Sequence, residues 1–255
     1  MTIPDGWLAD YANDLKASIA FLTRLPVAHA PPAAGADLAR AAWAFPLAGV
    51  LVALIAAVIY AVAHKIGSPP WVAAALAVAA TLAVTGCLHE DGLADTVDGF
   101  GGGDTRERKL DIMRDSRIGT YGVCALTLSI LLRVGAIASL GNPIVVLWAL
   151  VAAHGAARAA IPVFMALVPP ARSDGLAYAA GRPSGERVIT ASVLGILILA
   201  IALGPTLGIA ALILLLVAIV LMAWLSVVQI DGQTGDVLGA VEQVSEIVIL
   251  LVALR

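Results

Sequence analysis

The feature that most constrains this chain is an apolar stretch at residues 188–230, which holds no charged residue over 43 positions. A helix crosses a bilayer with about 20 predominantly apolar residues, so this stretch is long enough for two spans. Gly204-Pro205 lies near its middle, and proline cannot continue the hydrogen-bond ladder of a helix. The sequence therefore predicts two membrane-spanning helices that meet at Gly204-Pro205.

Other stretches of similar character extend this architecture to the rest of the chain. They cover residues 43–63, 71–88, 119–140, 144–169 and 237–254. Only 13% of the 255 residues are charged, against about 25% in a typical soluble domain. We find no internal repeat or second domain. The sequence predicts a single all-α domain over residues 1–255, a polytopic transmembrane helix bundle in the lipid bilayer with about seven spans.

The N-terminal segment has the pattern of a helix that lies in the membrane interface. Apolar residues recur there at helical spacing with polar ones between them: Trp7, Leu8, Tyr11, Leu15, Ile19 and Leu22 against Asp10, Asn13 and Asp14. No apolar core of a signal peptide precedes Lys16. We predict an interfacial helix within residues 1–28.

The basic residues outside the spans are distributed unevenly between the two sides. With the N-terminus inside, eleven fall in cytoplasmic segments: Lys16, Arg24, Arg40, Arg106, Arg108, Lys109, Arg114, Arg117, Arg172, Arg182 and Arg187. Only Lys65 and Arg255 fall outside. Lysine and arginine in short loops set topology, so we predict a cytoplasmic N-terminus and a cytoplasmic segment at residues 89–118. The net charge of −3 is too small to indicate a nucleic-acid partner.

The two cysteines, Cys87 and Cys124, lie in or beside apolar segments and lack metal-ligand spacing. We interpret both as small buried hydrophobic residues without a disulfide or redox role.

An acidic cluster follows the second apolar stretch. Asp91, Asp95 and Asp98 stand at i, i+4 and i+7, within about 60° of one another on one helix face. Three carboxylates on one face repel unless a cation lies among them, and oxygen ligands favour Mg²⁺ or Mn²⁺. We predict a metal site here. The alternative is a helix end whose acids are merely solvated.

The segment at residues 106–117 has the pattern of a short basic helix. Asp111 and Asp115 form a second i, i+4 acidic pair, while Arg114 and Arg117 offer planar donors for phosphate oxygens. An amphipathic surface helix with internal ion pairs would look the same. Beside a carboxylate cluster, the pattern favours phosphoryl or phosphodiester transfer.

Several ionisable residues lie inside predicted spans. His154 and Arg158 share a helix face, and we weigh a pairing of Arg158 with Glu242 or Glu246 equally with a role in substrate binding. Arg133 is expected to snorkel or to form an ion pair. Asp236 follows the tight polar turn at residues 232–235, on the same predicted membrane side as the acidic cluster.

These segments resemble the adenosylcobinamide-GDP ribazoletransferase (cobalamin synthase) family. The specific part runs from Thr85-Gly86-Cys87-Leu88-His89-Glu90-Asp91-Gly92 through Asp95, Asp98 and Gly103, and continues over residues 113–122. Phe21-Leu22-Thr23-Arg24-Leu25-Pro26, residues 45–49 and residues 234–240 are similar to further motifs of the family.

The resemblance implies the last assembly step of the vitamin B12 nucleotide loop. The substrates would be adenosylcobinamide-GDP and α-ribazole or its 5′-phosphate. The products would be adenosylcobalamin, or its 5′-phosphate, and GMP. The family is Mg²⁺-dependent and lies in the bacterial inner membrane, so the active site is expected at the cytoplasmic face. Whether the chain forms a homo-oligomer stays open.

Taken together, the residues and the resemblance lead to the following assignments. The predicted metal ligands are Asp91, Asp95, Asp98 and Asp115. Asp111 or Glu90 is the predicted general base. The residues predicted to bind substrate are Arg114, Arg117, His89, Asp236, Glu242 and Arg158.

Two other functions fit parts of the pattern. One is a CDP-alcohol-type phosphotransferase, whose metal site also lies on a helix with an Asp-Gly motif, although the spacing differs here. The other is a cation transporter, whose site would lie near the bilayer midplane on broken helices. The position of the acidic cluster, at a helix end beside an arginine-rich loop, favours an enzyme.

Overall fold

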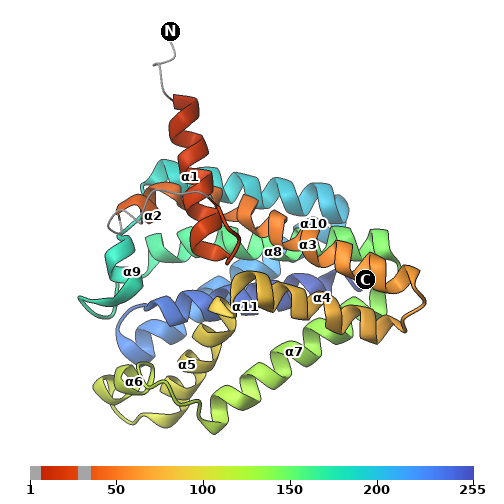
Figure 1. Ribbon diagram of the computed structural model, residues 1–255. Coiled ribbons are helices and arrows are strands. Elements are labelled where there is room, and N and C mark those ends of the chain that lie inside the picture. The colour runs from red at the N-terminus through yellow and green to blue at the C-terminus, as the bar shows by residue number, and fades with distance from the viewer. Residues whose placement is uncertain (1–6, 28–35) are drawn as a thin grey trace.

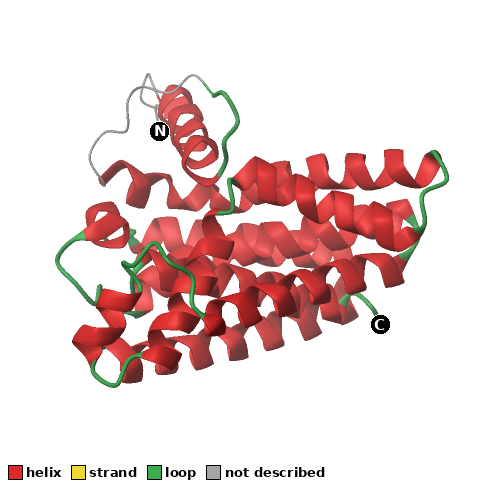
Figure 2. Cartoon of the chain, turned by 60° about the horizontal axis from the view of Figure 1, so that its bottom comes forward, coloured by secondary structure: helices red, strands yellow, loops and turns green. Residues whose placement is uncertain are grey.

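The computed structural model describes residues 7–27 and 36–255, and helices joined by short turns make up these two ranges (Figures 1 and 2). The helices are α1 (Trp7–Leu22), α2 (Ala36–Ala41), the 3₁₀ turn η1 (Ala42–Ala44), α3 (Phe45–Lys65), α4 (Pro70–Thr85), α5 (Leu88–Gly102), α6 (Arg106–Ile112), α7 (Thr120–Leu140), α8 (Pro143–Leu167), α9 (Gly175–Ala180), α10 (Gly185–Ile230) and α11 (Gly235–Val252). Within them no strand forms beyond a single bridge between Pro170 and Gln233. The predicted all-α class is confirmed.

Helix α8 occupies the centre of the bundle. Its buried residues lie all around the helix, and half of its length is alanine, glycine or valine. Such small residues let neighbouring helices approach closely inside a membrane. Helices α3, α10 and α11 pack around α8, as Figure 1 shows.

Within the described part of the chain, four segments are long and apolar enough to cross a membrane. They are Leu38–Lys65, Thr120–Leu140, Pro143–Leu167 and Gly185–Ile230, and a fifth is added if α4 and α5 count as one bent span. This confirms a polytopic membrane protein. The number of about seven spans and the cytoplasmic N-terminus stay predictions.

The long apolar stretch breaks where proline predicts it should. Gly204 has φ 74° and ψ 173°, outside the helical region. A Cβ atom on Gly208 would lie 3.0 Å from the carbonyl oxygen of Leu199, a residue that a continuous helix would hold two and a half turns away. The two halves of α10 therefore fold back on each other, and both pack on α8.

The predicted boundary of the second span, residues 71–88, was wrong at its C-terminal end. Helix α4 ends at Thr85, and the chain turns by 90° into α5. Gly86 and Cys87, with φ 64° and 58°, make this turn in the left-handed conformation. As a result α5 lies across the end of the bundle instead of along it (Figure 1).

Helix α1 is fastened to the bundle through one buried carboxylate. Asp14 lies 3.0 Å from Arg40 and 3.4 Å from Arg187, and it accepts a hydrogen bond from the indole of Trp43. The predicted N-terminal helix is thus present from Trp7 to Leu22. Residues 1–6 and 28 of that prediction lie outside the described residues, and its place in the membrane interface stays a prediction.

The prediction for the two cysteines was wrong about burial. Cys87 and Cys124 are both exposed free thiols. Cys124 is exposed on α7, a predicted span, where lipid would cover a small apolar side chain in place of protein. Cys87 lies in the turn between α4 and α5.

Candidate functional site

The acidic residues after α4 occupy one helix, as predicted, but their exposure differs strongly. Asp91 is exposed, Asp95 is half-buried and Asp98 is buried at the far end of α5. The difference is local: His89, Glu90 and Gly92 beside the exposed Asp91 are buried, whereas Asp98 is covered by the first turn of α7.

Helix α11 crosses α5 at two glycines. A Cβ atom on Gly239 would lie 3.2 Å from the Cα atom of Gly92, and one on Gly92 would lie 2.7 Å from the carbonyl oxygen of Asp236. Only glycine permits this backbone contact. The crossing brings Asp236, in the first turn of α11, to the acidic face of α5.

Mutual repulsion at this face is visible in Asp95. Burial, reinforced by the carboxylates of Asp91, Asp236 and Asp98, raises the pKa of Asp95 to about 7. A nearby cation would therefore strongly stabilise the charged form of the Asp95 carboxylate.

Asp98 caps the following helix from outside. Its two carboxylate oxygens accept hydrogen bonds from the backbone amides of Gly119 and Gly122, at 2.7 Å and 2.9 Å. These amides belong to the first turn of α7, where N–H groups lack partners within the helix and the helix dipole favours an anion. From the sequence we predicted Asp98 only as a metal ligand, and its hydrogen bonds to these two amides were not predicted.

The basic segment is shorter than predicted, since α6 ends at Ile112. Asp115 therefore lies in the turn before α7 and not on the same helix as Asp111. Asp115 accepts hydrogen bonds from Arg117, which lowers the pKa of the Asp115 carboxyl to about 2. Arg114 instead pairs with Asp174 at 2.5 Å.

Two cavities adjoin α5. The first, of 270 Å³, is mainly apolar and is lined by Phe21, Leu22, Leu38, Phe45, Leu88, His89, Asp91, Gly92, Ile161, Met165, Arg172, Ala177, Ala180, Gly235, Asp236, Leu238 and Gly239. We call it the apolar cavity. The second, of 420 Å³, is lined by Leu82, Cys87, Glu90, Asp91, Ala94, Asp95, Met113, Arg114, Asp115, Ser116, Ile118, Leu126 and Ile130. We call it the polar cavity. Asp91 lines both.

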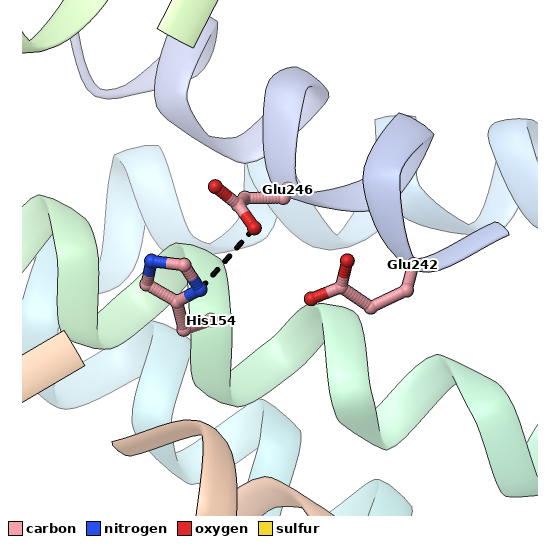
Figure 3. Close-up of side chains that lie close together, drawn as sticks. All are labelled: His154, Glu242 and Glu246. Carbon is pink, nitrogen blue, oxygen red and sulfur yellow. Dashed lines mark ion pairs between the residues drawn. The ribbon is translucent and has the colours of Figure 1, made fainter. Parts of the chain in front are cut away.

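A separate polar network lies in the bundle interior. His154 and Glu246 face each other with Nδ1 and Oε2 3.2 Å apart, and Glu242 lies beside them (Figure 3). Arg158 pairs with Glu242 at 2.6 Å. The arrangement confirms that Arg158 forms an ion pair with Glu242, one of the two alternatives left open by the sequence.

Arg133 joins this network to α5. Its guanidinium lies 3.0 Å from Glu90 and 3.3 Å from Glu246, and only 1% of its side chain is exposed. It therefore pairs inside the bundle and does not snorkel. Gln243 extends the connection by donating hydrogen bonds to Glu90 and Glu242.

The predicted site residues thus separate into groups by location. Asp91, Asp95, Asp115, Arg114 and Glu90 line the polar cavity, and His89 and Asp236 line the apolar one. Arg158 and Glu242 are buried in the interior network and line neither of these cavities, while Arg117 and Asp111 are exposed beside them.

Sequence reasoning missed two residues that link the cavities. Arg172 lies 3.6 Å from Asp236 in the apolar cavity. Asp174 pairs with Arg114, and one of its oxygens lies 3.5 Å from Arg172. The sequence could have indicated these two residues, because residues 172–174 belong to a polar segment predicted on the same membrane side as the acidic cluster.

The donor set around α5 fits a hard divalent cation. Asp91, Asp95 and Asp236 present carboxylate oxygens, the ligands that Mg²⁺ favours. The carboxylates of Asp91, Asp95 and Asp236 are not drawn together around one point. Among the described residues, the group of three ligand side chains whose donor atoms lie within 4.8 Å of one another is His154, Glu242 and Glu246. Those acids are already paired with Arg158 and Arg133. The predicted ligands Asp91, Asp95, Asp98 and Asp115 stay a prediction.

Comparison with known proteins gives a consistent result. The cobalamin-5-phosphate synthase family model matches residues 14–254. An adenosylcobinamide-GDP ribazoletransferase of Bradyrhizobium diazoefficiens is 58% identical over 94% of this chain and 92% of its own. Another, of Mesorhizobium japonicum, is 52% identical over the same shares. No solved structure matches. The chain belongs to the cobalamin-5-phosphate synthase family.

Proposed function

We propose that this protein joins adenosylcobinamide-GDP to α-ribazole or its 5′-phosphate, releasing GMP, at the cytoplasmic face of a bacterial inner membrane. The observation that carries the proposal is the position of Asp91, which lines both cavities. A reaction between two large substrates needs two binding regions that meet at one point. The family membership and the names of the relatives supply the identity of the substrates.

The polar cavity suits the pyrophosphate of adenosylcobinamide-GDP. Arg114 offers a planar guanidinium there, and Asp91 and Asp95, which line the same cavity, would hold Mg²⁺. Bound Mg²⁺ would neutralise negative charge on the pyrophosphate as the bond to GMP breaks. Asp174 keeps Arg114 at the cavity.

The ribose hydroxyl of α-ribazole attacks the phosphorus atom on the cobinamide side of the pyrophosphate. A new phosphorus–oxygen bond forms to the ribose, the bond to GMP breaks, and the hydroxyl proton passes to a carboxylate. Of the two predicted bases, Glu90 lines the polar cavity, whereas Asp111 is exposed on α6. Oε2 of Glu90 accepts no hydrogen bond from the described residues, so Glu90 is the better placed acceptor.

The deciding experiment is release of GMP from adenosylcobinamide-GDP by purified protein in detergent. We expect release that requires both α-ribazole and Mg²⁺. Release of CMP from a CDP-alcohol, with none of GMP, would favour the CDP-alcohol phosphotransferase instead. Absence of both activities in protein that is folded would overturn the proposal.

A further inference from the structure

The apolar cavity has a chemical character that differs from the rest of the site. Its walls are mainly aliphatic and aromatic, and the rings of Phe21 and Phe45 are inclined by 28° to each other, with centroids 6.0 Å apart. Its volume of 270 Å³ lies close to the lower end of the ~300–1,000 Å³ typical of small-molecule sites. A flat, mostly apolar group would fill it.

His89 supplies a polar group in this apolar setting. It lines the cavity with 3% of its surface exposed, and Nε2 has no hydrogen-bond partner among the described residues. Nδ1 lies 3.5 Å from Nη2 of Arg158, at the outer limit of a hydrogen bond. A guanidinium can only donate, so this contact is a hydrogen bond in the tautomer that carries the ring proton on Nε2. Glu242 lies 3.8 Å from Nδ1, too far to accept a hydrogen bond.

We propose that the apolar cavity receives the dimethylbenzimidazole base of α-ribazole, and that Nε2 of His89 donates a hydrogen bond to the unsubstituted ring nitrogen of this base. The inference rests on the proposed function for the identity of the substrate. It adds which cavity takes which substrate and which residue recognises the base.

The chemistry of the two substrates separates them between the cavities. The base of α-ribazole is flat, carries two methyl groups and has one ring nitrogen with an in-plane lone pair, so a single donor satisfies it. Guanine of the other substrate carries several polar groups that these walls would leave without partners. Burying such groups unpaired is costly, so the apolar cavity discriminates against guanine.

The polar rim of the cavity sets the orientation of the ligand. Asp91, Asp236 and Arg172 are the charged lining residues that are exposed or partly exposed, whereas the aromatic residue Phe45 is buried. With its base among the apolar residues, α-ribazole places its ribose at this rim. The ribose then lies beside Asp91, which also lines the polar cavity where the pyrophosphate is proposed to bind.

The test compares α-ribazole with its indole analogue, in which the ring nitrogen is replaced by C–H. Binding of both ligands is measured on full-length wild-type protein and on His89→Leu, in detergent. We expect the wild type to bind α-ribazole about tenfold more tightly, the scale of one neutral hydrogen bond and an unpaired donor. His89→Leu should bind both ligands with equal affinity. For each protein, the affinity for α-ribazole is compared with the affinity for the analogue. A variant that binds both ligands more weakly by the same factor would therefore keep the tenfold preference.

Two results would overturn the inference. One is a wild-type protein that binds both ligands equally, and the other is His89→Leu that keeps the tenfold preference. Either result alongside normal GMP release by the wild type would leave the proposed function standing. Loss of GMP release by the wild type itself would instead refute the proposed function.

A second pair of variants tests occupancy of the cavity without altering His89. Ala177 lines the cavity on α9, whereas Ala179 of the same helix is exposed. Ala177→Leu should raise the KM for α-ribazole about tenfold and leave that for adenosylcobinamide-GDP unchanged, while Ala179→Leu should change neither. An unchanged KM for α-ribazole in Ala177→Leu would show that the cavity holds something else, such as a lipid chain, and would overturn the inference.

Discussion

The guanidinium of Arg133 lies 3.0 Å from the carboxylate of Glu90, deep inside the bundle. Arg133 belongs to α7 and Glu90 to α5, and the same guanidinium also reaches Glu246 of α11. One buried arginine thus ties together the helix that carries the acidic cluster and the helix that crosses it.

Replacing this arginine should be strongly destabilising. Arg133→Met leaves Glu90 and Glu246 as buried charges without their partner, so we expect a loss of about 3–5 kcal/mol. The measurement is thermal unfolding of purified protein in detergent. Glu246→Gln is the matched comparison: it leaves two carboxylates, Glu90 and Glu242, opposite two guanidiniums and should cost less. Equal losses in the two variants would contradict this account.

Asp95 offers a direct test of the predicted metal site. Asp95→Asn keeps the side-chain shape and removes one anionic oxygen, so activity should fall by at least about a hundredfold, on the order of a lost ligand or its close support. GMP release is measured at saturating Mg²⁺, with the exposed Asp104→Asn as the control. Near-normal turnover of Asp95→Asn would remove this residue from the site.

Asp98 should behave differently because it caps α7. Asp98→Ala leaves the amides of Gly119 and Gly122 without their acceptors, and we expect a loss of about 1–2 kcal/mol in stability. Asp98→Asn keeps one acceptor oxygen and should be the milder change. Thermal unfolding ranks the two variants, and a harmless alanine would show that the cap contributes little.

Arg114 tests whether the polar cavity grips phosphate through planar geometry. Arg114→Lys keeps the charge but loses the fork, so apparent affinity for adenosylcobinamide-GDP should weaken by roughly 1–3 kcal/mol. Affinity for α-ribazole should barely change. Arg108→Lys, on the exposed surface of α6, is the control. An equal loss for both substrates would indicate a disturbed loop instead of a phosphate contact.

The predicted topology can be checked by cysteine labelling from the outer side. The exposed thiols Cys87 and Cys124 are first replaced by alanine, since both would react. A cysteine at position 255 should then be labelled in intact cells, and one at position 106 should not. The reverse pattern would place the acidic cluster outside the cytoplasm.

Much of the fold was accessible from the sequence because it depends on local properties. Apolar length predicts the long helices α3, α7, α8 and α10, Pro205 predicts the break in α10, and the spacing of Asp91, Asp95 and Asp98 predicts a shared helix face. The 90° turn into α5 was missed because Cys87 adopts a left-handed conformation that its residue type does not suggest.

The parts of the site that escaped prediction depend on contacts between distant segments. Asp98 meets amides that lie 21 and 24 residues further along the chain. Gln243 reaches Glu90 across 153 residues. Such contacts follow from how helices cross, and no local pattern in either segment reports them.

The two cavities are lined by different residues of α5 apart from Asp91, and this arrangement bears on the kinetics of a two-substrate reaction. If each cavity takes one substrate, as proposed, we expect that neither substrate has to arrive first. Double-reciprocal plots of the initial rate against the two substrates should intersect. GMP should still inhibit when α-ribazole is bound. A covalent intermediate on the protein would be unnecessary in such a layout, because the proposal places both substrates at Asp91 at the same time.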